Sequence, residues 1–87
     1  MDEQELRKIN AIFNDTWRFL KQHSDVKDTD AYWTEVLDEA NRIADKHERH
    51  PFGDELIVLC LDYLDAVAKG DEMKPGWRKK KNDKAEI

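Results

Sequence analysis

Two pairs of acidic residues have the types and spacing that could do chemistry. Glu35 and Asp38 stand three residues apart, and so do Asp62 and Asp65. On a helix this spacing places both members of a pair on one face. Carboxylates from two facing helices could hold a magnesium ion and polarise a phosphate substrate. Such an enzyme requires that the two acidic faces meet.

The paired carboxylates and the small helical chain resemble the all-α nucleotide pyrophosphatases, and this resemblance implies a magnesium-dependent enzyme. The pattern departs from that family, which favours Glu where this chain has Asp62. On a helical wheel, Asp62 and Asp65 also lie on the polar side of their helix, so a shared metal conflicts with burying Cys60. We therefore interpret the pairs as solvated acidic faces, predict no metal or cofactor, and keep the enzyme as an alternative.

The histidines and the single cysteine offer less chemistry. His47 and His50 stand three apart, which suits two metal ligands on a continuous helix, but three histidines and one cysteine are a poor set for a closed zinc site. His47 lies on an apolar face near a helix end, where a histidine usually packs and bonds a carbonyl group. Cys60 lies mid-way along an apolar arc with no companion base. We predict structural roles for these residues and no catalytic residue.

The end of the chain combines an aromatic residue with positive charge. Residues 71–87 carry 6 basic and 4 acidic groups, whereas residues 1–70 carry 9 basic and 16 acidic groups, a balance of −7. An acidic body disfavours nucleic acid, so only the tail offers a contact for it. The candidate partner-binding residues of the tail are Trp77, Arg78, Lys79, Lys80 and Lys81.

Three amphipathic segments must position these residues. Apolar residues recur at spacings of three and four, which predicts helices over about 2–22, 29–48 and 52–69. Pro51 separates the second helix from the third, and Gly70 ends the third. With short connections, these helices form an all-α, antiparallel three-helix bundle over residues 1–70, followed by a flexible basic tail over 71–87.

The first helix carries two apolar stripes. The spacing predicts an inward face centred on Phe13, with Trp17 beside it and Trp33 as the matching anchor on the second helix. Ile12 and Phe19 form a second stripe about 100° to 120° from Phe13. This stripe either packs sideways on the third helix or forms an exposed seam for a partner or a second copy. On the second interpretation, Ile12 and Phe19 are candidate partner-binding residues.

Composition limits the chain to one small domain. It has 87 residues, of which 39% are hydrophobic and 40% are charged, so the core must be thin and the domain marginally stable or dimeric. The sequence shows neither a membrane span nor a secretory signal, and we predict a cytoplasmic protein without membrane contact.

Three landmarks along the chain can be taken together. They are 17–21, then 30–33 with Val36, Glu39 and Ala40, then Phe52 with 54–57 and 62–64. Their order and spacing resemble a group of uncharacterised helical proteins of firmicute genomes, phages and mobile elements. The resemblance covers roughly residues 13–67, and it implies a helical fold and a bacterial or phage setting. It carries over no functional residue, and Pro51 and the basic tail depart from it.

These observations favour a non-enzymatic protein-interaction or regulatory module of bacterial or phage accessory origin. Its expected partner is another protein or a second copy. Besides the magnesium-dependent enzyme, one alternative is an acidic inhibitor that mimics nucleic acid and blocks a host defence enzyme, which requires acidic residues gathered on one face.

Overall fold

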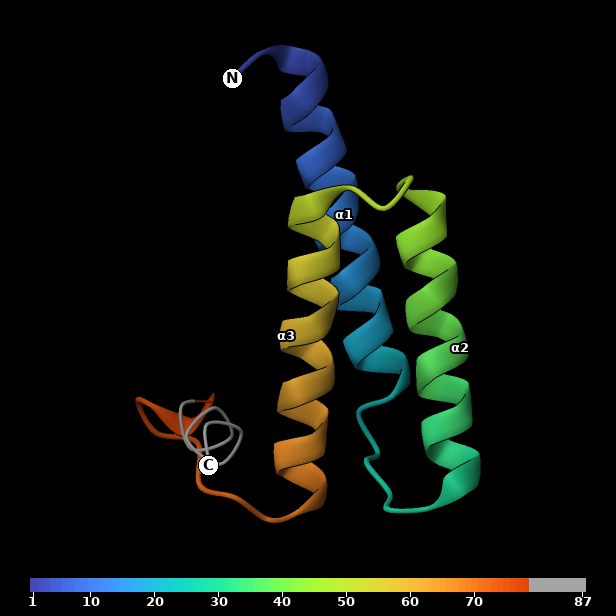
Figure 1. Ribbon diagram of the computed structural model, residues 1–87, viewed down its shortest axis with the longest axis vertical. Helices are drawn as coiled ribbons and strands as arrows, with labels where there is room; N and C mark the ends of the chain where they lie inside the picture. Colours follow the sequence, from blue (N-terminus) through green and yellow to red (C-terminus); the bar gives the residue numbers. More distant parts are fainter. Residues whose placement is uncertain (79–87) are drawn as a thin grey trace, which may run out of the picture.

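The described part of the chain, residues 1–78 of a computed structural model, folds into three helices (Figure 1). They are α1 (Glu3–Gln22), α2 (Asp30–Lys46) and α3 (Pro51–Ala68). α1 and α3 run in the same direction, and α2, which lies between them in sequence, runs in the opposite direction (Figure 1). The predicted all-α three-helix bundle is therefore confirmed, with each helix end within two residues of its predicted position.

Local signals in the sequence define the helix ends. The Asp2 carboxylate accepts the Glu5 N–H at 2.8 Å, and the Thr29 hydroxyl accepts the Tyr32 N–H at 3.2 Å. α3 begins at Pro51, whose missing N–H costs nothing in a first turn. It ends at Ala68, and Gly70, just after the helix, adopts the left-handed backbone conformation, with φ of 75°, that glycine tolerates.

The core lies where α1 meets both other helices. Small residues on α2 leave room for larger ones on α1, and α3 has a glycine at a point of close approach. A Cβ atom on Gly53 would stand 3.4 Å from the Ile12 side chain, so Gly53 lets α1 pack closely on α3. The buried hydrophobic residues are Ile12, Phe19, Val36, Ala40, Ile43, Ala44, Ile57, Cys60, Leu64 and Ala66.

The prediction that the Phe13 side of α1 faces the core is wrong. Ile12 is 0% and Phe19 1% exposed, whereas Phe13 is 50% and Trp17 62% exposed. Of the two interpretations of the Ile12 and Phe19 stripe, the packed one holds, so these residues are not a partner-binding seam. The reason is steric, because the Ile12 side fits against Gly53, and Phe19 fits among the small side chains of α2. Trp33 is half-buried against the core, as predicted.

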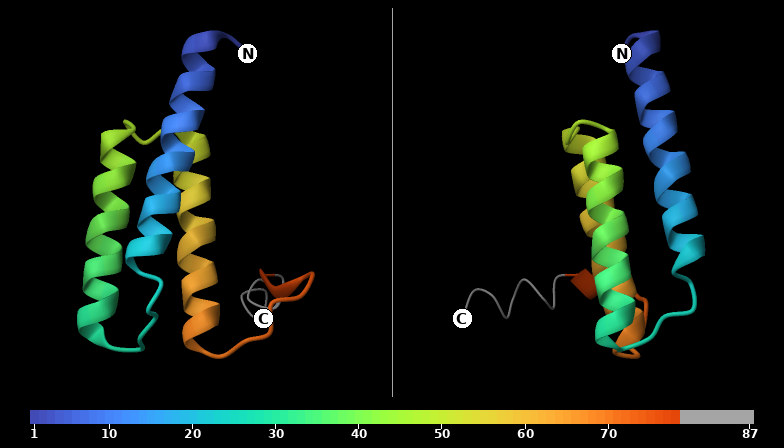
Figure 2. Two further views of the ribbon diagram at one scale, coloured as in Figure 1. Left: turned by 180° about the vertical axis from the view of Figure 1, so that it is seen from behind. Right: turned by 90° about the vertical axis from the view of Figure 1, so that its right-hand side faces the viewer.

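The first turns of α1 project beyond the connection between α2 and α3 (Figure 2). Leu6, on this projecting part, is 55% exposed. It lies on the same side of α1 as Phe13 and Trp17, given the helical period. α1 thus carries a continuous apolar stripe that the rest of the described chain does not cover.

The rotation of α1 can be tested with two phenylalanines on the same helix. We expect Phe19→Ala to lower the free energy of unfolding by about 3–5 kcal/mol, because it empties a buried site. Phe13→Ala should cost at most about 1.5 kcal/mol, because half of that side chain is already in water. Urea denaturation followed by circular dichroism measures both. Equal losses would mean that α1 is turned otherwise.

Candidate functional site: the groove between α1 and α3

A wide apolar groove runs between α1 and α3. Its volume is about 930 Å³, near the upper end of the range for ligand sites in proteins. α1 supplies one wall, α3 supplies the other wall and the floor, and the loop after α1 and the segment after α3 close one end. The lining residues are Phe13, Thr16, Trp17, Leu20, Lys21, Ser24, Val26, Leu56, Leu59, Cys60, Tyr63, Leu64, Val67 and Trp77.

Exposed aromatic and aliphatic side chains form the walls of this groove. Trp17 is the most exposed of them, and the Lys21 ammonium lies 5.6 Å from the centre of its ring. Across the groove, Leu59, Tyr63 and Val67 of α3 are 37 to 40% exposed. The sequence predicts an inward-facing α3 arc broad enough to touch two neighbours, and this part of the arc faces the groove instead.

The groove has few polar groups among its lining residues. The described residues that line it include no histidine, aspartate or glutamate. The Thr16 hydroxyl donates to the Ile12 and Phe13 carbonyls at 2.9 and 3.0 Å, so it is already engaged. Burial raises the pKa of the Cys60 thiol, which keeps the sulfur protonated and weakly nucleophilic at neutral pH. The groove is suited to apolar contact.

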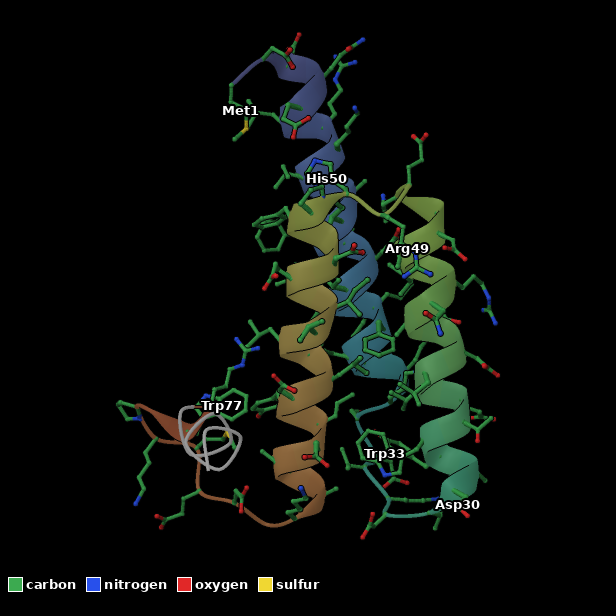
Figure 3. All side chains as sticks on the ribbon, in the orientation of Figure 1. Met1, Asp30, Trp33, Arg49, His50 and Trp77 are labelled. Atoms are coloured by element: carbon green, nitrogen blue, oxygen red, sulfur yellow. The ribbon has the colours of Figure 1, made fainter. Side chains whose placement is uncertain are left out.

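Trp77 stands at the end of the groove, beside α3 (Figure 3). Its ring meets Tyr63 edge to face, with the ring centres 6.1 Å apart. The next residue, Arg78, donates from Nε and Nη2 to one Asp62 oxygen, at 3.0 and 2.8 Å. Two residues of the predicted tail, Trp77 and Arg78, thus contact α3. Of the other tail candidates, Lys79, Lys80 and Lys81 lie outside the described residues.

The acidic pairs do not come together as a metal site. Glu35 and Asp38 are exposed on α2, Asp62 binds Arg78, and Asp65 lies 3.0 Å from the Lys69 ammonium. Within residues 1–78, no group of three or more histidine, cysteine, aspartate or glutamate side chains is placed to hold a metal ion.

The two histidines considered as metal ligands, His47 and His50, connect α1 to the end of α2 and the start of α3. His47 Nε2 lies 2.7 Å from an Asp15 carboxylate oxygen, and His50 Nε2 lies 2.9 Å from a Glu5 oxygen. His50 stands where α3 begins beside α1 (Figure 3). The Lys46 ammonium is a second partner of Asp15, at 3.0 Å. These polar contacts hold the same side of α1 that the apolar core buries.

Asp15 is a buried charge that the sequence pattern did not single out. It is 8% exposed. Burial alone would raise its pKa, but hydrogen bonds and charge attraction from Lys46 and His47 outweigh this, so the pKa of Asp15 lies below its usual 3.8. Its spacing of three from Ile12 and four from Phe19 was the available signal, because it puts Asp15 on their stripe.

No family model, curated protein or solved structure matches this chain. Within the described residues, no helix combines the length and the apolar character that a membrane span requires.

The Asp15 cluster predicts a pH-dependent loss of stability. Because the pKa of Asp15 is lowered on folding, its ionised form stabilises the fold above about pH 3.8, and this contribution is lost as the pH falls further. We expect Asp15→Asn to lower the free energy of unfolding by about 1–3 kcal/mol near pH 7. The difference in the free energy of unfolding between variant and wild type should become smaller near pH 3. Urea unfolding at both pH values measures it.

A matched control is Asp45→Asn, which removes an exposed ion pair with Arg49 on the surface of α2. Exposed pairs contribute little, so this variant should unfold close to wild type at both pH values. A pH-independent gap for Asp15→Asn would contradict the assignment of the ionised carboxylate as the stabilising form.

Proposed function

We propose that this chain is a small non-enzymatic protein-interaction module that takes the apolar face of an amphipathic helix into the groove between α1 and α3. The proposal depends on one observation. Phe13 and Trp17 are 50% and 62% exposed, and both line the groove of about 930 Å³. Large exposed apolar patches on small proteins are typical of interaction sites.

The shape and chemistry of the groove favour a helix as its occupant. Two parallel helices form its walls, and on α3 it extends from Leu56 to Val67, a length of about 17 Å or three helical turns. Helix-in-groove recognition uses apolar side chains spaced over such a length. The lining supplies few polar groups, so an extended peptide would find few partners for its backbone hydrogen bonds.

The other functions considered from the sequence have less support. A magnesium-dependent enzyme needs a cluster of metal ligands. Within residues 1–78, no three or more histidine, cysteine, aspartate or glutamate side chains are placed to hold a metal ion. The inhibitor that mimics nucleic acid requires acids on one face, but several acidic side chains here pair with basic ones, among them Asp15, Asp62 and Asp65. A bacterial or phage origin stays a prediction from the sequence resemblance.

Peptide binding tests the proposed function. The probe is a fluorescent amphipathic peptide of leucine and lysine, and its control is a scrambled peptide of the same composition. We expect the wild type to bind the amphipathic peptide in fluorescence anisotropy and not the scramble. Trp17→Lys should weaken binding at least about tenfold, because it places a charge in the groove.

Leu37→Lys is the matched variant for this experiment, because Leu37 is 49% exposed on α2 and does not line the groove. It should bind the amphipathic peptide like wild type. Absence of binding by the wild type, equal binding of the scramble, or wild-type binding by Trp17→Lys would each refute the proposed role of the groove.

A further inference from the structure

We infer that the helix face which occupies the groove belongs to a second copy of this chain, joined to the first by a two-fold axis at the level of Trp17. This inference rests on the proposed function and adds the identity of the partner.

The uncovered stripe is longer than the groove. Leu6 lies eleven residues before Trp17, about 17 Å along α1, and projects beyond the start of α3 (Figure 2). It is 55% exposed although it continues the line of Phe13 and Trp17. A helix that fills only the groove leaves Leu6 exposed to water. A partner that covers the whole stripe must therefore also extend beyond the start of α3.

The register of the two parallel helices shows what can cover Leu6. Phe13 meets Phe52 with ring centres 5.5 Å apart, and Ile12 lies against Gly53, so Trp17 is level with about Ile57 on α3. Val67 then lies about 15 Å from this level, on the side opposite to Leu6. A two-fold axis at Trp17 therefore brings Leu6 of each copy close to Val67 of the other.

Both halves of a self-complementary contact are present on one chain. Trp17 projects from α1, and the hollow beside it has Cys60 and Leu64 as its floor. A two-fold interface requires such a pairing of projection and hollow on the same surface.

The exposed apolar area fits a dimer of ordinary size. Seven large side chains of the stripe and groove are each 37 to 62% exposed. At roughly 150–250 Å² for an aromatic side chain, they expose on the order of 500 Å² of apolar surface. A standard interface buries about 800 Å² on each partner, apolar and polar atoms together. The seven residues are Leu6, Phe13, Trp17, Phe52, Leu59, Tyr63 and Val67.

The charges at the ends of the stripe favour the antiparallel arrangement. The first turns of α1 and α3 are acidic, with Glu3, Glu5 and Asp54, and Lys69, which pairs with Asp65, caps the C-terminal end of α3. The same axis places the first turn of α1 opposite Lys69 of the second copy, whereas a parallel pairing would put the acidic turns together. The net charge of −5 opposes association, but at physiological salt this repulsion is screened beyond about 8 Å.

Sedimentation velocity over a concentration series tests the inference on the full chain. We expect the wild type to pass from monomer to dimer between about 1 and 300 μM. Trp17→Lys and Leu6→Lys should each weaken the dimer at least about tenfold and keep the helical circular dichroism spectrum, because both side chains are exposed in the single chain. Leu37→Lys should dimerise like wild type.

Leu6 separates a second copy from a foreign helix. Leu6→Lys should leave binding of the amphipathic peptide unchanged, because Leu6 does not line the groove. A wild type that stays monomeric at about 300 μM but binds the peptide through Trp17 would overturn the second copy and leave the proposed function standing. A dimer that survives Trp17→Lys or Leu6→Lys would overturn the inferred interface.

Discussion

The rotation of α1 about its own axis is the constraint on which the rest of the structure depends. Ile12 packs against α3 at Gly53, and Phe19 joins the cluster that includes Val36 and Ala40 of α2. Because a helix is rigid over this length, burying one side fixes the direction of every other side chain. Phe13 and Trp17 are therefore turned toward the groove. The exposed apolar groove is a consequence of how the core is packed.

Polar contacts select the same rotation as the apolar ones. Asp15 lies on the buried side of α1 and meets His47 and Lys46, while Glu5 meets His50. A buried carboxylate is tolerated only with such partners, since leaving it unpaired costs more than the pair contributes. Turning α1 so that Phe13 and Trp17 faced the core would break these pairs and expose Ile12 and Phe19. The two kinds of contact therefore exclude the orientation that the hydrophobic pattern alone favours.

This explains which features the sequence could predict. The helix ends depend on residues a few positions away, such as Thr29, Pro51 and Gly70, and the sequence placed them to within two residues. The choice between two apolar stripes on α1 depends on its contacts with residues of α2 and α3 far along the chain, such as Val36 and Gly53, and local spacing contains no trace of them. The groove could not be predicted for the same reason, because its position depends on which stripe is buried. The predicted core role of Trp17 was therefore wrong, and of the two interpretations of Ile12 the packed one holds.

The two apolar sides of α1 also couple binding to folding. One side holds the domain together through a thin core, and the other shares the groove with α3, where Phe13 and Phe52 already touch edge to face. An occupant of the groove contacts both helices at once and is lost when they separate, so it binds the folded chain and not the unfolded one. Such binding stabilises the fold in proportion to the logarithm of the occupant's concentration. A chain with 40% charged residues and a small core can therefore depend on its partner for part of its stability, and the exposed stripe is what makes that dependence possible.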